Sequence, residues 1–180
     1  MTRALPILFG LLMASAPLEA IGATRIVTTA ASPSDTKPNS DRVPDAYAIS
    51  GNFSRIVVMR MKYKTDLLAG IEKLVKQQHI RSGVILSGIG SLRGYHVHQV
   101  SNRDFPTQNI FTDEPNTPCD LVGMNGYVVD GKVHAHMTLG TGPRAIAGHL
   151  EPGTEVFTYA IVTVGVLDAD LKGIDDKAYR

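Results

Sequence analysis

The sequence predicts an α+β fold in which a sheet is covered on one side by helix. One segment, Asp66 to His79, shows a helical period, whereas the other apolar segments are short or alternate as strands do. The expected order is strand, helix, strand and then strands joined in hairpins, which is typical of a sheet with a segregated helix.

The expected helix follows a first strand over Phe53 to Tyr63, where Val, Ile and Met alternate loosely. Its apolar residues recur at i, i+1, i+4, i+7 and i+8, which places them on one core-facing side. They are Leu67, Leu68, Ile71, Leu74 and Val75. Thr65 is the expected N-cap, and Asp66 favours the positive end of the helix dipole.

Five further strands are expected after the helix. They cover Val84 to Ile89, Leu92 to Val100, Cys119 to Val129, Lys132 to Leu139 and Val156 to Leu167. Gly88-Ile89-Gly90 is interpreted as a turn rather than a phosphate-binding loop. Asp130-Gly131 predicts a tight hairpin. Gly140 to Pro143 is expected to return the chain toward His149.

Residues 1–23 have the features of a signal peptide. Arg3 gives a positive start, Ala4 to Ala16 is an apolar run, and Ile21-Gly22-Ala23 fits the small-x-small pattern that signal peptidase accepts. The run is shorter than the about 20 apolar residues that span a bilayer. We therefore expect a periplasmic or secreted protein that begins near Thr24 and has no membrane contact after cleavage.

Residues 24–50 are expected to form a flexible leader. Pro33, Pro38 and Pro44 stand among many Ser, Thr, Asp and Asn residues, a composition that buries too little apolar area to offset ordering the chain. Residues 51–180 remain as one domain, long enough for a hydrophobic core.

The charge balance argues against nucleic acid as a partner. The chain has 18 Lys and Arg against 17 Asp and Glu, a formal net charge of +1, so no basic field neutralises phosphates. Cys119 is the single cysteine and has no intramolecular disulfide partner. We expect it to be buried as a small apolar residue.

Three of the six histidines, His134, His136 and His149, lie in one short stretch. On a strand, His134, His136 and Thr138 share one face, and two such imidazoles stand about 6 to 7 Å apart at Cα. A third histidine from the next turn completes a set that suits one divalent ion. The alternative interpretation is a partly exposed polar face without a ligand.

His96 and His98 form a second His-x-His pair on the strand expected over Leu92 to Val100. On a regular strand they share a face with Leu92 and Val100. They are therefore either a buried structural pair or reserve ligands.

The segment Gly131 to Leu150 resembles the signature of the plant and prokaryote conserved (PPC) domain, in which a Gly-x-x-His-x-His strand leads to a Gly-Gly-His-Leu turn. Ile80 to Leu92 is similar to the strand and glycine turn after the first helix of that family. Cys119 to Gly126 stands where relatives have a Glu-Leu-Leu-Ser-Leu-Ser-Gly-like strand. The departures are Ala147 for the first glycine of the turn and Asp120 where many relatives have glutamate.

The resemblance implies a mixed, largely antiparallel sheet with flanking helix, assembled as a homotrimer. Together with the signal peptide expected over residues 1–23, it indicates an exported bacterial member of the family. We expect a divalent transition metal, zinc before the others, held by His134, His136 and His149. These ligands come from one subunit or are shared between subunits.

Three side chains are candidates to accept imidazole N–H groups behind the metal, namely Thr138, Asp120 and Glu155. The first functional hypothesis is an exported metal-binding protein with an unidentified small-molecule ligand. The alternative is a metal-dependent hydrolase or lyase with Asp120 or Glu155 as general base. A second alternative is DNA binding, because plant relatives combine this domain with AT-hooks; this chain has no Arg-Gly-Arg-Pro hook.

Overall fold

The structure, a computed structural model, describes residues 24–30 and 38–174. Its elements, in chain order, are β1 (Arg25–Ala30), β2 (Phe53–Lys62), α1 (Leu67–Gln77), β3 (Ser82–Val100), β4 (Gln108–Glu114), β5 (Cys119–Val129), β6 (Lys132–Gly140), β7 (Ala145–Leu150) and β8 (Glu155–Leu167). The signal peptide expected over residues 1–23 lies outside the described residues. The leader expected over 24–50 contains strand β1.

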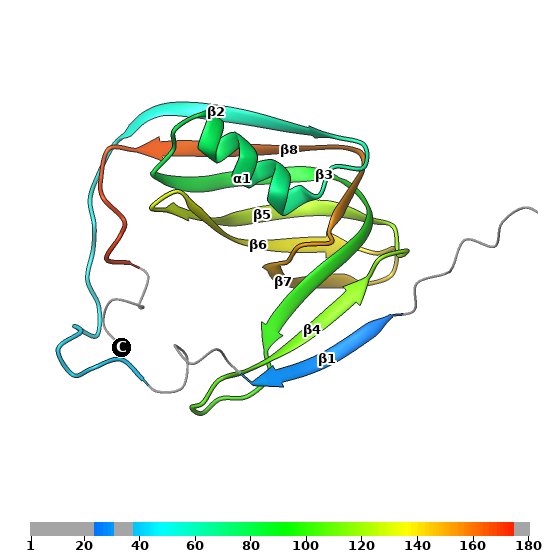
Figure 1. Ribbon diagram of the computed structural model, residues 1–180, viewed down its shortest axis with the longest axis horizontal. Helices are drawn as coiled ribbons and strands as arrows, with labels where there is room; N and C mark the ends of the chain where they lie inside the picture. The colour runs from blue at the N-terminus through cyan, green and yellow to red at the C-terminus, as the bar shows by residue number, and fades with distance from the viewer. Residues whose placement is uncertain (1–23, 31–37, 175–180) are drawn as a thin grey trace, which may run out of the picture.

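All eight strands belong to one sheet, with the order β1-β4-β3-β5-β6-β7 and with β8 pairing both β3 and β2. Every pairing among these strands is antiparallel. The parallel pairing of a mixed sheet therefore does not occur in the described ranges. The α+β class holds, with one short helix among the described elements (Figure 1).

β3 is the strand that connects the sheet. It pairs with β5 and β8 along its first part and with β4 and β7 along its last residues. The turn expected at Gly88-Ile89-Gly90 is wrong, because the 19 residues of β3 form one strand. Glycine is needed there for close packing instead: a Cβ on Gly90 would lie 2.5 Å from the carbonyl oxygen of Tyr159.

Register irregularities bend β3 and change which side chains face the core. The pairing with β8 shifts between Leu92 and Gly94. After this shift Tyr95 and Val97 are buried, so His96 and His98 lie on the opposite face. The expected face shared with Leu92 is therefore wrong, because a bulge interrupts the two-residue alternation.

The helix lies inside the predicted range and begins one residue later than its expected cap predicts. The N-cap is Asp66, not Thr65, and its carboxylate accepts a hydrogen bond of 2.8 Å from the amide of Ala69. Leu67, Ile71 and Val75 are buried against the sheet. No helix in the described ranges is both long and apolar enough to cross a membrane.

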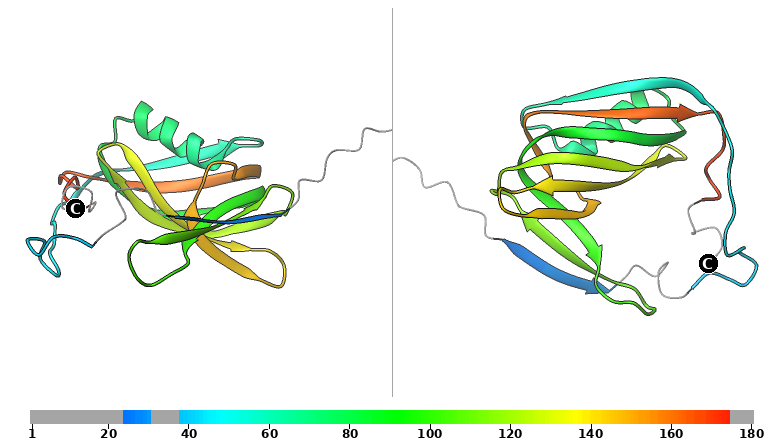
Figure 2. Two further views of the ribbon diagram at one scale, coloured as in Figure 1. Left: turned by 60° about the horizontal axis from the view of Figure 1, so that its bottom comes forward. Right: turned by 180° about the vertical axis from the view of Figure 1, so that it is seen from behind.

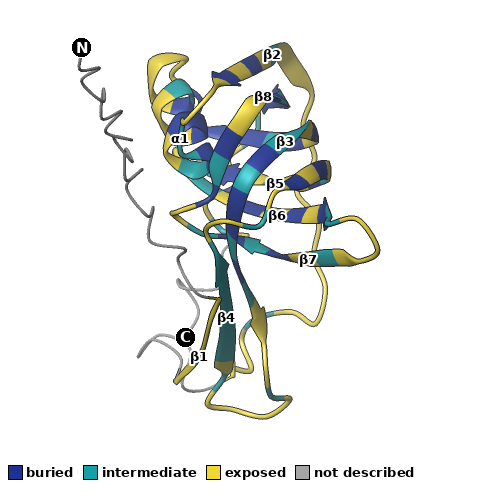
Figure 3. Cartoon of the chain, turned by 90° about the vertical axis from the view of Figure 1, so that its right-hand side faces the viewer, coloured by how far each residue is buried: buried dark blue, intermediate teal, exposed yellow. Residues whose placement is uncertain are grey.

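α1 covers one face of the sheet and leaves the opposite face without a helix (Figure 2). The covered face carries the core, which includes Ala135, Met137 and Leu139 of β6. Figure 3 shows the resulting alternation of buried and exposed residues along the strands. The inward and outward sets predicted for this strand are confirmed, since His134, His136 and Thr138 are exposed.

Three strands were not expected. β7 follows the turn expected over Gly140 to Pro143 and pairs with β6 and β3. β1 and β4, together with the end of β3, form an extension from the body of the sheet (Figures 1 and 3). The hairpin at Asp130-Gly131 is confirmed, with φ values of 48° and 78°.

Strands β5 and β6 approach each other closely at Gly126 of β5, beside the histidines. Its φ is 147°, and an added Cβ would lie 2.1 Å from the carbonyl oxygen of His134. We expect Gly126→Ala to lower the free energy of unfolding by about 1–3 kcal/mol through strain and overpacking, as measured by urea denaturation. The matched control is Gly123→Ala, whose Cβ would meet nothing within 4 Å. Equal losses in both variants would contradict this reasoning.

Candidate metal centre

A single row of paired residues across the sheet carries three histidines. His98 of β3 is opposite His149 of β7, which in turn is opposite His136 of β6. The row continues to Phe111 of β4 on one side and to Asn125 of β5 on the other. Because directly paired residues share a face of an antiparallel sheet, the three imidazoles stand side by side.

A second row lies two residues further along the same strands. It contains His134, which is opposite Tyr127 of β5, and Glu151, which follows β7 two residues after His149. Residues two apart on a strand share a face. The two rows together form the histidine cluster, defined as His98, His134, His136, His149 and Glu151.

The imidazole rings of the cluster are in contact with one another. The Nε2 atoms of His134 and His136 are 3.3 Å apart. The ring centroid of His149 lies 4.9 Å from that of His134, 5.4 Å from that of His136 and 4.6 Å from that of His98. The structure thus brings together the three predicted ligands and one of the two reserve histidines.

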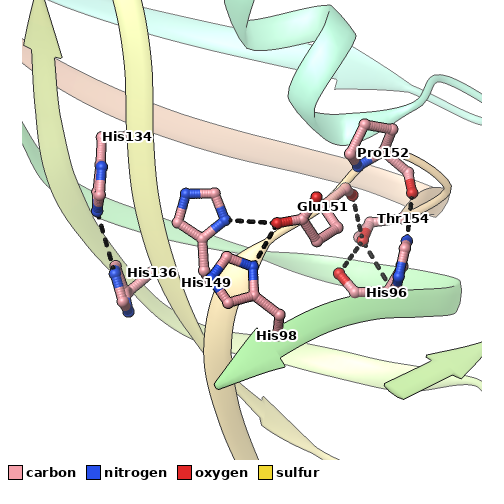
Figure 4. Close-up of polar contacts among 8 residues, drawn as sticks. All are labelled: His96, His98, His134, His136, His149, Glu151, Pro152 and Thr154. Atoms are coloured by element: carbon pink, nitrogen blue, oxygen red, sulfur yellow. Dashed lines mark hydrogen bonds and ion pairs between the residues drawn. The ribbon is translucent and has the colours of Figure 1, made fainter. Parts of the chain in front are cut away.

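Glu151 holds two of these rings by one carboxylate oxygen. Its Oε1 is 2.5 Å from Nδ1 of His98 and 2.9 Å from Nδ1 of His149. An Nδ1–H that donates to a carboxylate leaves the lone pair on Nε2, the tautomer that binds metal. In Figure 4 the Nδ1 edges of both rings face Glu151, and their opposite edges face the side where His134 and His136 lie.

A polar turn fixes the position of Glu151. The Glu151 amide donates to the carbonyl of His96 over 3.1 Å. The fully buried Thr154 accepts through its hydroxyl from the amide of His96 and lies 3.1 Å from the carbonyl oxygens of His96 and Glu151. The amide of Gly153 donates over 2.7 Å to the N-cap residue Asp66. The carboxylate is therefore anchored to both β3 and the start of α1.

His96 lies outside the cluster. Its Nδ1 is 2.8 Å from the carbonyl oxygen of Pro152, and its ring lies 5.8 Å from that of Phe111. The two reserve histidines therefore separate, since His98 joins the cluster and His96 stabilises the turn that carries Glu151.

Burial and neighbouring imidazoles favour the neutral form of two histidines. Burial lowers the pKa of His136, and the nearby His134 and His98 lower it further. Burial also lowers the pKa of His149, with a further lowering by His98, while Glu151 opposes the shift. Neutral imidazole is the form that ligates a metal ion.

The residues expected to support the metal from behind lie elsewhere. Asp120 is opposite Gly140 at the far end of β6, and Glu155 forms an ion pair with Arg93. Thr138 is on the histidine face but is paired with Gly123 and Ala147. In the described part of the chain, the residue that accepts imidazole N–H groups of the cluster is Glu151 instead.

Cys119 has no part in the cluster. Its side chain is buried as expected, and burial, followed by the charge of Asp120, raises the pKa of its thiol to about 11. The thiol is thus held protonated and unreactive.

The donor atoms fit a divalent transition metal. One donor atom each from His98, His149 and Glu151 lie within 4.8 Å of one another, and the Nε2 atoms of His134 and His136 are adjacent. Imidazole nitrogen suits zinc, copper, nickel and iron. Glu151 was not among the predicted site residues, and His98 was predicted only as a reserve ligand. The signal for Glu151 was its place two residues after His149, on the same strand face.

The order of these motifs along the chain agrees with a known family. The sequence pattern of the Plants and Prokaryotes Conserved (PCC) domain, called PPC above, matches residues 48–168. The chain belongs to this family. None of the curated proteins compared with it matches.

Solved structures share the PPC fold with this chain. A PPC protein from Pyrococcus horikoshii is 24% identical, with 68% of this chain and 85% of that chain covered and a TM-score of 0.55. A metal-containing protein from Archaeoglobus fulgidus is 23% identical, with 69% and 88% covered and a TM-score of 0.60. A proposed DNA-binding protein from Bacteroides thetaiotaomicron is 18% identical, with 67% and 85% covered and a TM-score of 0.55.

The lowered histidine pKa values predict a pH-dependent stability of the metal-free protein. Below the ordinary histidine pKa of 6.5, the unfolded chain binds protons that the native cluster does not bind. The contribution of these histidines to the free energy of unfolding is therefore fully present above that pH and is lost as the pH decreases. Thermal unfolding in a chelator between pH 8 and 5 measures this loss. We expect His149→Gln to flatten the dependence. The exposed-loop control His79→Gln should leave it unchanged, and identical slopes in all three proteins would exclude the cluster as its cause.

Proposed function

We propose that this protein is an exported, trimeric PPC-domain protein that binds one divalent transition metal ion, zinc before the others, at the histidine cluster. The observation that carries the proposal is the packing of four imidazoles beside one another, with neighbouring ring centroids 4.6 to 5.4 Å apart, and with two of them bound to one carboxylate. Imidazoles packed this closely stabilise one another little, but each can supply a lone pair to a shared cation.

His134, His136 and His149 are the proposed ligands. Glu151 orients His149, and it also orients His98, which is a fourth imidazole beside the ion. A bound divalent ion supplies Lewis acidity and an attraction for anionic ligands. Burial in the chain itself favours the neutral form of His136 and His149, and the carboxylate fixes the orientation of His98 and His149.

A relative supports metal as the ligand. The protein from Archaeoglobus fulgidus is described as metal-containing, and this chain has the donor atoms for the same property. Zinc is proposed first because three imidazoles with an exchangeable further position are a frequent zinc ligand set.

Exposed apolar side chains support self-association. They lie on the sheet face opposite α1, the face that also bears the cluster, and include Ile56, Val58, Ile89, Val122 and Tyr159, which are 42% to 66% exposed. Large apolar side chains exposed on one sheet face are typical of protein contact surfaces. A homotrimer that covers this face would place the histidine cluster close to a subunit boundary.

Nucleic acid is not the proposed partner. The relative from Bacteroides thetaiotaomicron is described as a proposed DNA-binding protein, but this chain has a formal net charge of +1. Non-specific DNA affinity depends on the number of phosphates neutralised by Lys and Arg. A near-neutral chain lacks that contribution.

Metal content tests the site. We expect the purified protein to hold close to one zinc or similar ion per subunit by elemental analysis, and the double variant His134→Ala/His136→Ala to hold none. Glu151→Gln should weaken metal affinity by about 10- to 100-fold, because it removes the carboxylate behind two imidazoles. The control His79→Ala lies outside the cluster and should bind normally. Full metal retention by the double variant would refute the ligand assignment.

Export and assembly are tested on protein from fractionated cells. We expect periplasmic or secreted protein with an N-terminus near Thr24, by mass spectrometry under denaturing conditions. Native mass spectrometry of the same sample should give three times the subunit mass. Val58→Asp places a charge in the exposed apolar face, where Val58 is 66% exposed, and should shift the protein to monomer. Cytoplasmic protein that retains Met1 would refute export, and a monomeric wild type would refute the trimer.

A further inference from the structure

Within the described part of the chain, two polar side chains border the histidine cluster without a hydrogen-bond partner of their own. Asn125 is directly opposite His136, and Tyr127 is directly opposite His134. Both side chains are exposed, Tyr127 by 44%. No hydrogen bond from the Asn125 amide or the Tyr127 hydroxyl is recorded to any residue of the described ranges. Paired residues of adjacent strands have Cβ atoms about 4.5–5.5 Å apart, so these donors stand within reach of a group bound at the imidazoles.

The two sides of the cluster differ in chemistry. On the β4 side, the ring of Phe111 packs against that of His98 with centroids 5.0 Å apart. On the β5 side stand the hydroxyl of Tyr127 and the amide of Asn125. Phe111 offers no hydrogen bond, so of these two sides only the β5 side supplies hydrogen-bond donors to a ligand.

The charge of the occupied cluster favours an anion there. Glu151 is the single carboxylate of the cluster, and its Oε1 is already shared by Nδ1 of His98 and His149 (Figure 4). A divalent cation among neutral imidazoles therefore leaves a net positive charge after Glu151 is counted. Two hydrogen-bond donors beside such a charge are suited to carboxylate oxygen.

We propose that Tyr127 and Asn125 form a carboxylate-binding subsite beside the metal ion. The ligand is a small carboxylate whose oxygen contacts the metal and accepts hydrogen bonds from the Tyr127 hydroxyl and the Asn125 amide. This inference rests on the proposed metal-binding function and names the class of ligand that the site takes. Tyr127 and Asn125 select the ligand and do not hold the metal.

The test uses the full mature protein loaded with Co²⁺, whose visible absorption reports changes at the metal. Acetate is the probe, titrated at constant ionic strength, with chloride as the reference anion. The variants are Tyr127→Phe and Asn125→Ala. The matched control is Tyr159→Phe, an exposed tyrosine of β8 on the same face. Cobalt content is measured separately in every sample by elemental analysis.

We expect acetate to change the cobalt spectrum of the wild type, and to bind about tenfold or more weakly in both variants, as the loss of a hydrogen bond to a charged group predicts. Cobalt content and the Tyr159→Phe titration should match the wild type. Unchanged acetate affinity in Tyr127→Phe and Asn125→Ala, with normal cobalt content, would overturn the subsite and leave the metal site standing. If the wild-type protein binds no cobalt, both the metal site and the subsite are overturned.

Discussion

The pairing of β3 with four other strands is the constraint on which the site depends. Its first part pairs with β5 and β8, and its last residues pair with β4 and β7. Because β5 also pairs with β6, and β6 with β7, the strands β3, β5, β6 and β7 form a closed circle of pairings. This closure places His98 opposite His149. Without it, the row of imidazoles would end at β7, and Glu151 would have one ring to orient instead of two.

The same closure explains how a polar cluster is accommodated on a strongly apolar sheet. The imidazoles stand on the face away from α1, while Ala135, which lies between His134 and His136, and Met137 are buried in the core. The carboxylate that joins His98 and His149 is held by a turn whose polar atoms are paired with β3 and with the helix cap. The hydrophobic core thus fixes the backbone, and the polar turn fixes the side chains. The hydrogen bonds of Glu151 orient His98 and His149 without a bound ion.

The spacing of residues along the chain was sufficient to predict the elements that depend only on neighbouring residues. The helix, the Asp130-Gly131 hairpin and the outward face of His134 and His136 follow from spacing alone, and the structure confirms them. β4 and β7 lack a long apolar alternation and are defined by their neighbours in the sheet. The place of His98 depends on a register shift near Leu92 and on the β3–β7 pairing, neither of which has a sequence signal. Glu151 had a signal, its two-residue spacing from His149, that was not used.

Strand β1 lies outside the family domain but packs beside the residues that border the cluster. It lies before residues 48–168, the range that matches the PPC pattern, in the segment expected to be a flexible leader. Its half-buried Val27 is opposite Phe111, and Phe111 is opposite His98, whose ring it contacts. The row that carries the imidazoles therefore begins in the leader. Since a side chain is held by the neighbours it packs against, the apolar wall of the cluster depends on a strand outside the matched domain. The segment that follows the expected export signal is accordingly part of the environment of the site.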